Sequence, residues 1–103
     1  MSGANAYRGE CSLEVGGETL VLRPSFAALV AAEEELGSLF ELVEQAAAGQ
    51  LGLQQIVALF DHLSKSRVGA ITRERIGEAV VELGLAKITP VLRAVLSQVL
   101  QGR

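Results

Sequence analysis

The 103-residue chain has no tryptophan and only one cysteine, one histidine and one tyrosine. A single cysteine cannot form an internal disulfide, which fits the reducing environment of the cytoplasm. A metal cluster would need carboxylates from separate parts of the chain, and the sequence has no His-x-x-x-His, Cys-x-x-Cys, Gly-x-Gly-x-x-Gly or phosphate-loop pattern. We therefore expect no enzymatic activity, no metal and no cofactor. The composition favours a binding or assembly module.

Long apolar runs are also absent. Stretches such as Ala27 to Ala32 are too short to cross a bilayer, and residues 1–8 show no apolar segment behind a basic start, so we expect neither a membrane span nor a secretory signal. Apolar residues nevertheless make up 50% of the chain, which excludes a disordered tail. We predict a flexible leader over residues 1–8 and a single cytoplasmic domain over residues 9–103.

Charge is distributed unevenly along the chain. Residues 1–50 carry a net charge of −6 and residues 51–103 a net charge of +3. The weakly basic second half falls far short of the concentrated positive surface that binds a phosphate backbone. The amphipathic segments also lack a basic face with bulky aromatics, which membrane-surface helices carry. We expect neither nucleic acid nor a membrane as a partner.

A β-hairpin is predicted over residues 10–23. Gly16-Gly17 supplies the two residues with positive φ that a two-residue hairpin turn needs. Pairing around this turn sets Leu13 opposite Leu20 and gives the hairpin one apolar face. Two strands alone are marginal in water, so this face must lie on helices. The free edges could also pair across a two-fold axis, which makes a homodimer through the hairpin edges a hypothesis.

Five helices are predicted after the hairpin, over about residues 25–36, 38–48, 53–65, 72–83 and 89–101. The expected start signals are a Ser25 cap, a capping box of Ser38 with Glu41, a Thr72 cap, and Thr89-Pro90 as cap and first-turn proline. The third helix is apolar around most of its circumference, which indicates a central position. The fold class is thus mainly α (α+β), with an N-terminal two-stranded hairpin packed on a compact bundle of about five short helices. The predicted core joins Leu13, Leu20 and Leu22 to Phe26, Leu29, Ile56, Phe60 and Val95.

Three clusters allow more than one interpretation. Glu33-Glu34-Glu35 is either a solvated helix face or a contact with basic residues of the second half or of a partner. Asp61-His62 suggests a site, but adjacent helical residues do not face one another, and His62 is best interpreted as a surface or satisfied core residue. The stretch Gly84 to Lys87 could be the turn of a helix-turn-helix, but the helix after it is too apolar to read DNA.

The chain resembles a known family over nearly its whole length, and the distinctive residues lie in its first third. Arg8-Gly9-Glu10, Leu13, Gly17, Leu20, Leu22-Arg23-x-Ser25-Phe26-x-Ala28-Leu29 and Glu33-x-x-Leu36-Gly37 are similar to the start of the gene transfer agent family of small phage tail proteins. Departures are Pro24, which replaces a usual aliphatic residue, and Gly52, which replaces a capping serine. The resemblance implies a bacterial, mainly alphaproteobacterial, tail assembly chaperone, once labelled a tail tube protein, and offers no catalytic residues.

The resemblance also implies a partner, a tape-measure-like protein whose apolar helical segments must be held during tail assembly. A structural tail component is the alternative, and a small DNA-binding regulator is a weaker one. The candidate partner-binding surface joins the first two predicted helices. It consists of the apolar anchors Phe26, Val30, Leu39 and Phe40, with an acidic rim of Glu33, Glu34 and Glu35.

Overall fold

The structure, a computed structural model, describes residues 11–64 and 71–101. The predicted leader over residues 1–8 lies outside the described residues. Strands β1 (Cys11–Val15) and β2 (Glu18–Leu22) are followed by helices α1 (Phe26–Leu36), α2 (Leu39–Ala47), α3 (Leu53–Leu63), α4 (Arg73–Leu83) and α5 (Leu85–Gln101). Five helices and one hairpin confirm the predicted fold class.

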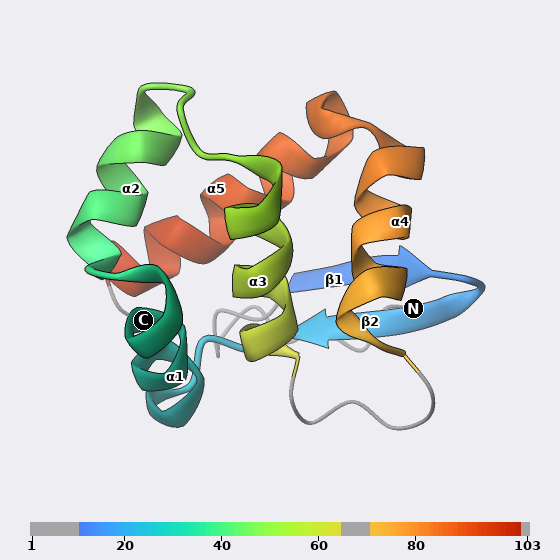
Figure 1. Cartoon of the computed structure of the whole chain (residues 1–103), viewed down its shortest axis with the longest axis horizontal. Coiled ribbons are helices and arrows are strands. Elements are labelled where there is room, and N and C mark those ends of the chain that lie inside the picture. The colour runs from blue at the N-terminus through green and yellow to red at the C-terminus, as the bar shows by residue number, and fades with distance from the viewer. Residues whose placement is uncertain (1–10, 65–70, 102–103) are drawn as a thin grey trace.

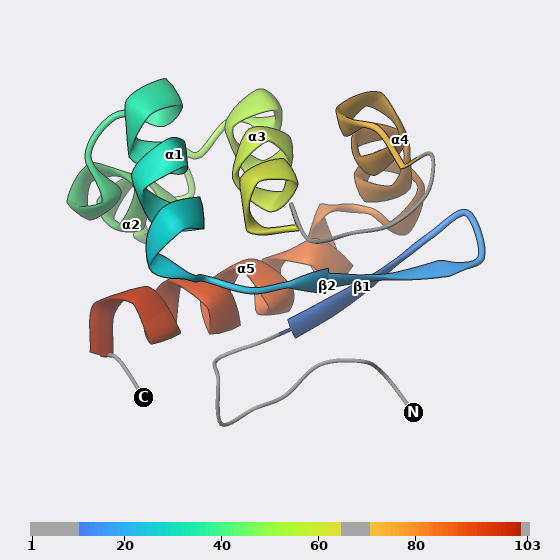
Figure 2. The ribbon, with the colours of Figure 1, turned by 90° about the horizontal axis from the view of Figure 1, so that it is seen from below.

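The elements form two layers. Helices α1, α3 and α4 lie side by side in one layer, with α2 beyond α1, and the hairpin and α5 form the layer beneath them (Figures 1 and 2). Contacts between α1 and α3, and between α3 and α4, hold the first layer together. The core lies between the layers. Its most buried side chains include Leu20, Leu22, Leu59, Phe60, Ile76, Val80 and Val95.

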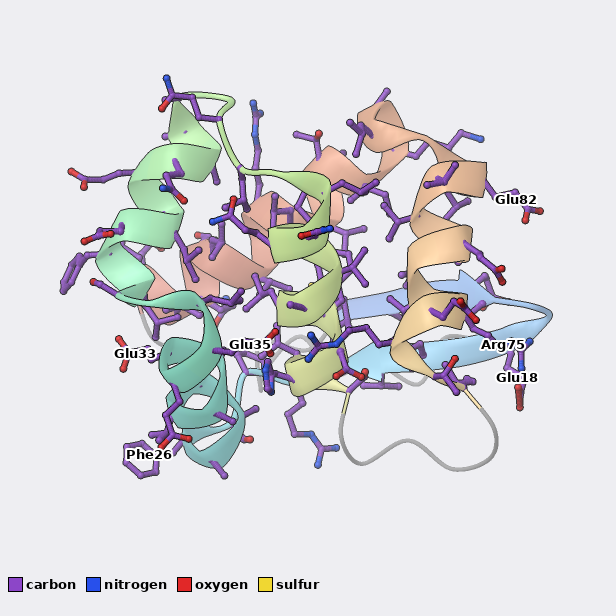
Figure 3. All side chains as sticks on the ribbon, viewed as in Figure 1. Glu18, Phe26, Glu33, Glu35, Arg75 and Glu82 are labelled. Atoms are coloured by element: carbon purple, nitrogen blue, oxygen red, sulfur yellow. The ribbon has the colours of Figure 1, made fainter. Side chains whose placement is uncertain are left out.

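The hairpin has the predicted register. Leu13 pairs with Leu20 and Cys11 with Leu22, and both turn glycines have positive φ, 56° at Gly16 and 83° at Gly17. The face that carries Leu13 and Leu20 is buried under the helices. Arg75 of α4 reaches the hairpin turn (Figure 3), where a Cβ at Gly16 would overlap its guanidinium group. The turn therefore needs glycine at this position for its backbone, whereas the flexible Arg75 side chain can move aside.

Helix α1 buries a different face from the predicted one. Phe26 was expected in the core but is 85% exposed, whereas Ala28 and Ala32 are buried. The two alanines are four residues apart and form one stripe, and their small side chains let α1 approach α3 closely. The start of the helix is as predicted, because the Ser25 hydroxyl accepts a hydrogen bond from the backbone N–H of Ala28 at 3.2 Å.

The second helix starts at Leu39 as predicted but without the predicted capping box, and the predicted start of the fifth helix is wrong. Ser38 makes no capping hydrogen bond with its side chain at α2; instead the Glu33 carboxylate accepts from the N–H of Leu39 at 3.2 Å. The fifth helix begins at Leu85 rather than at Thr89, and Pro90 lies inside it. Its first turn follows Gly84 directly, since the Gly84 carbonyl accepts from the N–H of Ile88.

Burial of Ile88 explains the early start of α5. Ile88 is 1% exposed, so the first turn of α5 packs into the core. The Thr89 hydroxyl donates to the carbonyl of Leu85 at 2.7 Å and caps no helix N-terminus. The Thr-Pro pair is a local signal for a helix start, and packing of Ile88 overrides it.

The two phenylalanines Phe60 and Phe26 provide a test of this core. Phe60 is fully buried, so we expect Phe60→Ala to reduce the free energy of unfolding by about 3–5 kcal/mol. The same truncation at exposed Phe26 should change it by less than about 0.5 kcal/mol. Urea denaturation followed by circular dichroism measures both. Equal losses in the two variants would contradict the described packing of α1.

Candidate functional site

The outer face of α1 carries two of the predicted apolar anchors. Phe26 and Val30 are four residues apart and therefore lie on the same side of the helix, and they are 85% and 39% exposed. Phe26 points away from α3 and α4 (Figure 3). The opposite side of α1, which carries Ala28 and Ala32, packs on the core. This outer face is available to a partner.

Helix α2 contributes the third anchor. Its buried residue is Leu42, whereas Phe40 is 73% exposed and Leu39 is partly buried. The sequence places Phe40 off the apolar stripe of this helix, and its exposure agrees with that. We call the exposed apolar residues Phe26, Val30 and Phe40 the α1–α2 face.

The structure separates the three glutamates of the predicted acidic rim. Glu33 caps α2, as described above, and Glu34 is exposed. Glu35 points toward α3 rather than outward (Figure 3). It lies three residues after Ala32 and so follows the stripe that packs on α3. The acidic run was interpreted either as a solvated face or as a contact with basic residues. For Glu35 the second interpretation holds, because it pairs with Arg73 of the second half.

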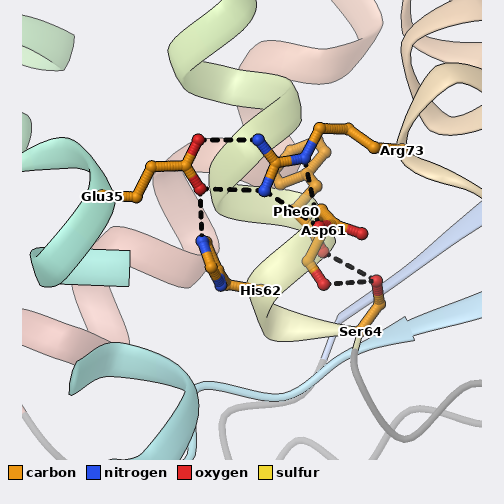
Figure 4. A network of polar contacts seen from close by, with 6 residues as sticks. All are labelled: Glu35, Phe60, Asp61, His62, Ser64 and Arg73. Atoms are coloured by element: carbon orange, nitrogen blue, oxygen red, sulfur yellow. Dashed lines mark hydrogen bonds and ion pairs between the residues drawn. The ribbon is translucent and has the colours of Figure 1, made fainter. Parts of the chain in front are cut away.

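Glu35 is part of a polar network that joins α1, α3 and α4 (Figure 4). Its carboxylate accepts two hydrogen bonds from the Arg73 guanidinium, at 2.7 and 2.8 Å. Arg73 also donates to Asp61 at 3.0 and 3.1 Å. The Nε2 atom of His62 lies 2.6 Å from Oε1 of Glu35. The network thus ties the end of α1 to the end of α3 and the start of α4.

The network shifts the ionisation of two of its members. Hydrogen bonds from Arg73, and then from His62, lower the pKa of Glu35 to about 2. The hydrogen bond to Glu35 likewise raises the pKa of Arg73 above its usual value. Both shifts favour the charged forms, so the pair stays ionised over the physiological range.

The geometry of His62 is poorly suited to general-base catalysis. A general base would need the second nitrogen of His62 to face a substrate, but Nδ1 is buried and makes no hydrogen bond. Among the described residues, no group of three His, Cys, Asp or Glu side chains could hold a metal ion. Cys11 is partly buried, and this burial raises the pKa of its thiol, which disfavours the reactive thiolate.

Sequence reasoning missed a groove between α3 and α4. It has a volume of about 1030 Å³ and ends at the Glu35–Arg73 pair. Val57, Ala58 and Gly77 line its floor. The spacing of its lining residues on α4 was visible in the sequence, but the sequence could not show that the same face of α3 would lie beside them.

Comparison with known proteins places the chain in a family. A sequence profile described as "Phage tail tube protein, GTA-gp10" matches residues 8–102, nearly the whole length of the chain. The chain belongs to this family. The match supports the gene transfer agent and phage tail assignment that the resemblance implied. No curated protein and no solved structure matches the chain. Over the described ranges 11–64 and 71–101, no helix is long and apolar enough to cross a membrane.

The low pKa of Glu35 predicts a pH dependence of stability. In the unfolded chain this carboxyl titrates near 4.5, and in the folded chain near 2, so the folded state binds its proton less readily. The contribution of Glu35 is therefore complete above about pH 4.5 and is lost as the pH falls toward 2. We expect Glu35→Gln to be less stable than the wild type at pH 7. The difference in free energy of unfolding between the two proteins should become smaller as the pH falls from about 4.5 toward 2.

Urea denaturation of both proteins at several pH values measures this difference, and NMR titration of the Glu35 carboxyl measures the pKa directly. Glu34→Gln is the matched control, because Glu34 is an exposed neighbour with the same charge. A constant difference from pH 7 to pH 3 would refute the assigned role of Glu35.

Proposed function

We propose that this protein is a non-enzymatic tail assembly chaperone that binds apolar helical segments of a tape-measure-like protein in the bacterial cytoplasm. Its family membership supports a role in phage-type tails. Such a role requires a small domain that binds a helix through exposed apolar side chains and later releases that helix. Helix recognition through a few apolar anchors is a common mode of peptide binding.

The observation that carries the proposal is the exposure of two phenylalanines. The chain has three phenylalanines, and Phe26 and Phe40 remain 85% and 73% exposed while Phe60 is buried. Burial of such a side chain contributes roughly 1.5–3 kcal/mol, so a partner that covers both gains a substantial part of its binding free energy. Aromatic anchors of this kind dominate many interfaces.

A structural tail component is the second candidate, and the family's own description as a tail tube protein favours it. The two roles differ in where the protein ends up. A chaperone is absent from finished particles, whereas a tube subunit is abundant in them, so fractionation of purified particles separates the two. A DNA-binding regulator is less well supported, because the helix that would read DNA is part of the core. Its buried residues are Ile88, Leu92, Val95 and Leu96.

Phe40→Ala tests the α1–α2 face. Because Phe40 is exposed, the variant should keep the melting temperature of the wild type and yet retain less of the co-expressed tape-measure protein in a pull-down. Leu42→Ala is the control on the same helix: Leu42 is 1% exposed, so its truncation should lower the melting temperature.

Two results would count against this proposal. If Phe40→Ala destabilises the free domain as Leu42→Ala does, the face is misplaced. If the wild-type domain neither solubilises nor retains the tape-measure protein, the chaperone role itself is wrong.

Self-association through the hairpin edges stays a prediction. The sheet has two strands, so each strand leaves one edge without a strand neighbour in the described part of the chain. We expect light scattering at high micromolar concentration to report a dimer, and a monomer at that concentration would exclude this mode of pairing.

A further inference from the structure

The groove between α3 and α4 has the form of a helix-binding site. The two helices lie side by side on the surface that faces away from the hairpin and α5 (Figures 1 and 2). Each helix has 11 residues and is therefore about 16 Å long, which matches roughly three turns of a partner helix. Leu53 and Val81 are apolar residues at the edges of the groove, and their exposed fractions are 44% and 65%.

One wall of the groove is acidic. Glu74, Glu78 and Glu82 line it on α4 at intervals of four residues, and Glu82 projects from the outer side of the helix (Figure 3). Like charges at this spacing weaken an isolated helix. None of the three forms an ion pair with a described residue. A row of carboxylates without an ion-pair partner among residues 11–64 and 71–101, beside an apolar floor, is complementary to a helix with an apolar stripe and a basic flank.

Gly77 gives a second, independent indication. It lies in the middle of α4, where glycine is less favourable than alanine, and it lines the groove floor. Packing on α3 does not require it, because a Cβ at this position would meet Val57 at 3.7 Å, an ordinary contact. The missing side chain instead leaves room for a partner to approach the backbone of α4.

The described helices of a second copy of this chain do not have the required chemistry. The bases of its described helices are Arg73 and Arg75 on α4, and Lys87 and Arg93 on α5. Spacings of two and six residues put each pair on different sides of its helix, so no described helix presents a basic row. The described helices of a second copy therefore do not fit the groove, which favours a helix of a different protein as the occupant.

We infer that the α3–α4 groove binds an amphipathic helix that carries a row of Lys or Arg beside its apolar stripe. This inference does not depend on the chaperone role, since the groove and the α1–α2 face involve different residues. The Glu35–Arg73 pair closes one end of the groove and sets where the bound helix stops. Charge then selects the partner and its orientation, while the apolar floor supplies contact area.

The test uses the full chain and two synthetic peptides of about five helical turns, or roughly 18 residues. Both carry the same Leu and Ala stripe; one has Lys on its flank and the other has Glu at those positions. Fluorescence anisotropy should show the Lys peptide binding at least about tenfold more tightly, with an affinity that falls as salt is added. Backbone amide shifts in NMR spectra should change along α3 and α4.

Glu78→Lys should weaken binding of the Lys peptide at least about fivefold, because it replaces an attraction by a repulsion. The variant should not lower the melting temperature, since a lysine there lies four residues from both Glu74 and Glu82. Glu44→Lys makes the same charge change on exposed α2, outside the groove, and should leave this affinity unchanged. Gly77→Leu should block binding by filling the groove floor.

The inference is overturned if the two peptides bind equally, or if Glu78→Lys and Glu44→Lys have the same effect. It is also overturned if the amide shifts cluster around Phe26 and Phe40, or if sedimentation shows a dimer that Gly77→Leu dissociates. Amide shifts around Phe26 and Phe40 would move the peptide to the α1–α2 face and leave the chaperone proposal standing, so the two proposals fail separately.

Discussion

The rest of the structure depends on the burial of α3, a helix that has seven buried residues out of eleven. Helices α1 and α4 lie on either side of it, and the hairpin lies beneath it (Figure 2). Each of these neighbours needs to contribute only one apolar stripe, such as Ala28 and Ala32 on α1. Their other faces are not used by the core. The exposure of Phe26 and Val81 is therefore a consequence of how a short chain encloses one central helix.

The polar network has the same origin. Asp61 belongs to α3 and is only 4% exposed, and a buried carboxylate is unfavourable unless it is paired. Arg73 provides this pairing from the start of α4, and its remaining hydrogen-bonding capacity holds Glu35 of α1. Glu35 is thereby held in an ion pair between helices, and its carboxylate is not free to form the acidic rim of the α1–α2 face. In the proposed groove, charge recognition falls instead to the acidic row on α4.

The sequence predicted well the features that depend on neighbouring residues. The hairpin register follows from Gly16-Gly17 and strict alternation, and the Ser25 and Thr72 caps depend on residues three positions away. Two local signals failed, the Ser38–Glu41 capping box and the Thr89-Pro90 helix start. The other failures involve contacts between distant segments. Phe26 was predicted in the core because it is a large apolar side chain. The structure instead buries the smaller Ala28 and Ala32, which let α1 approach α3. Glu35 and Arg73 are 38 residues apart, and no local pattern links them. The groove likewise exists only once α3 and α4 lie side by side.

The two candidate surfaces differ in what they can distinguish. The α1–α2 face offers exposed aromatic area, which attracts any apolar helix and suits a partner whose sequence varies along its length. The groove adds a charge requirement, which penalises helices without a basic flank. Exposed phenylalanines also promote aggregation, and the net charge of −6 over residues 1–50 counters this by repulsion between copies. The acidic first half of the chain thus favours the solubility of an exposed apolar face, independently of which partner covers it.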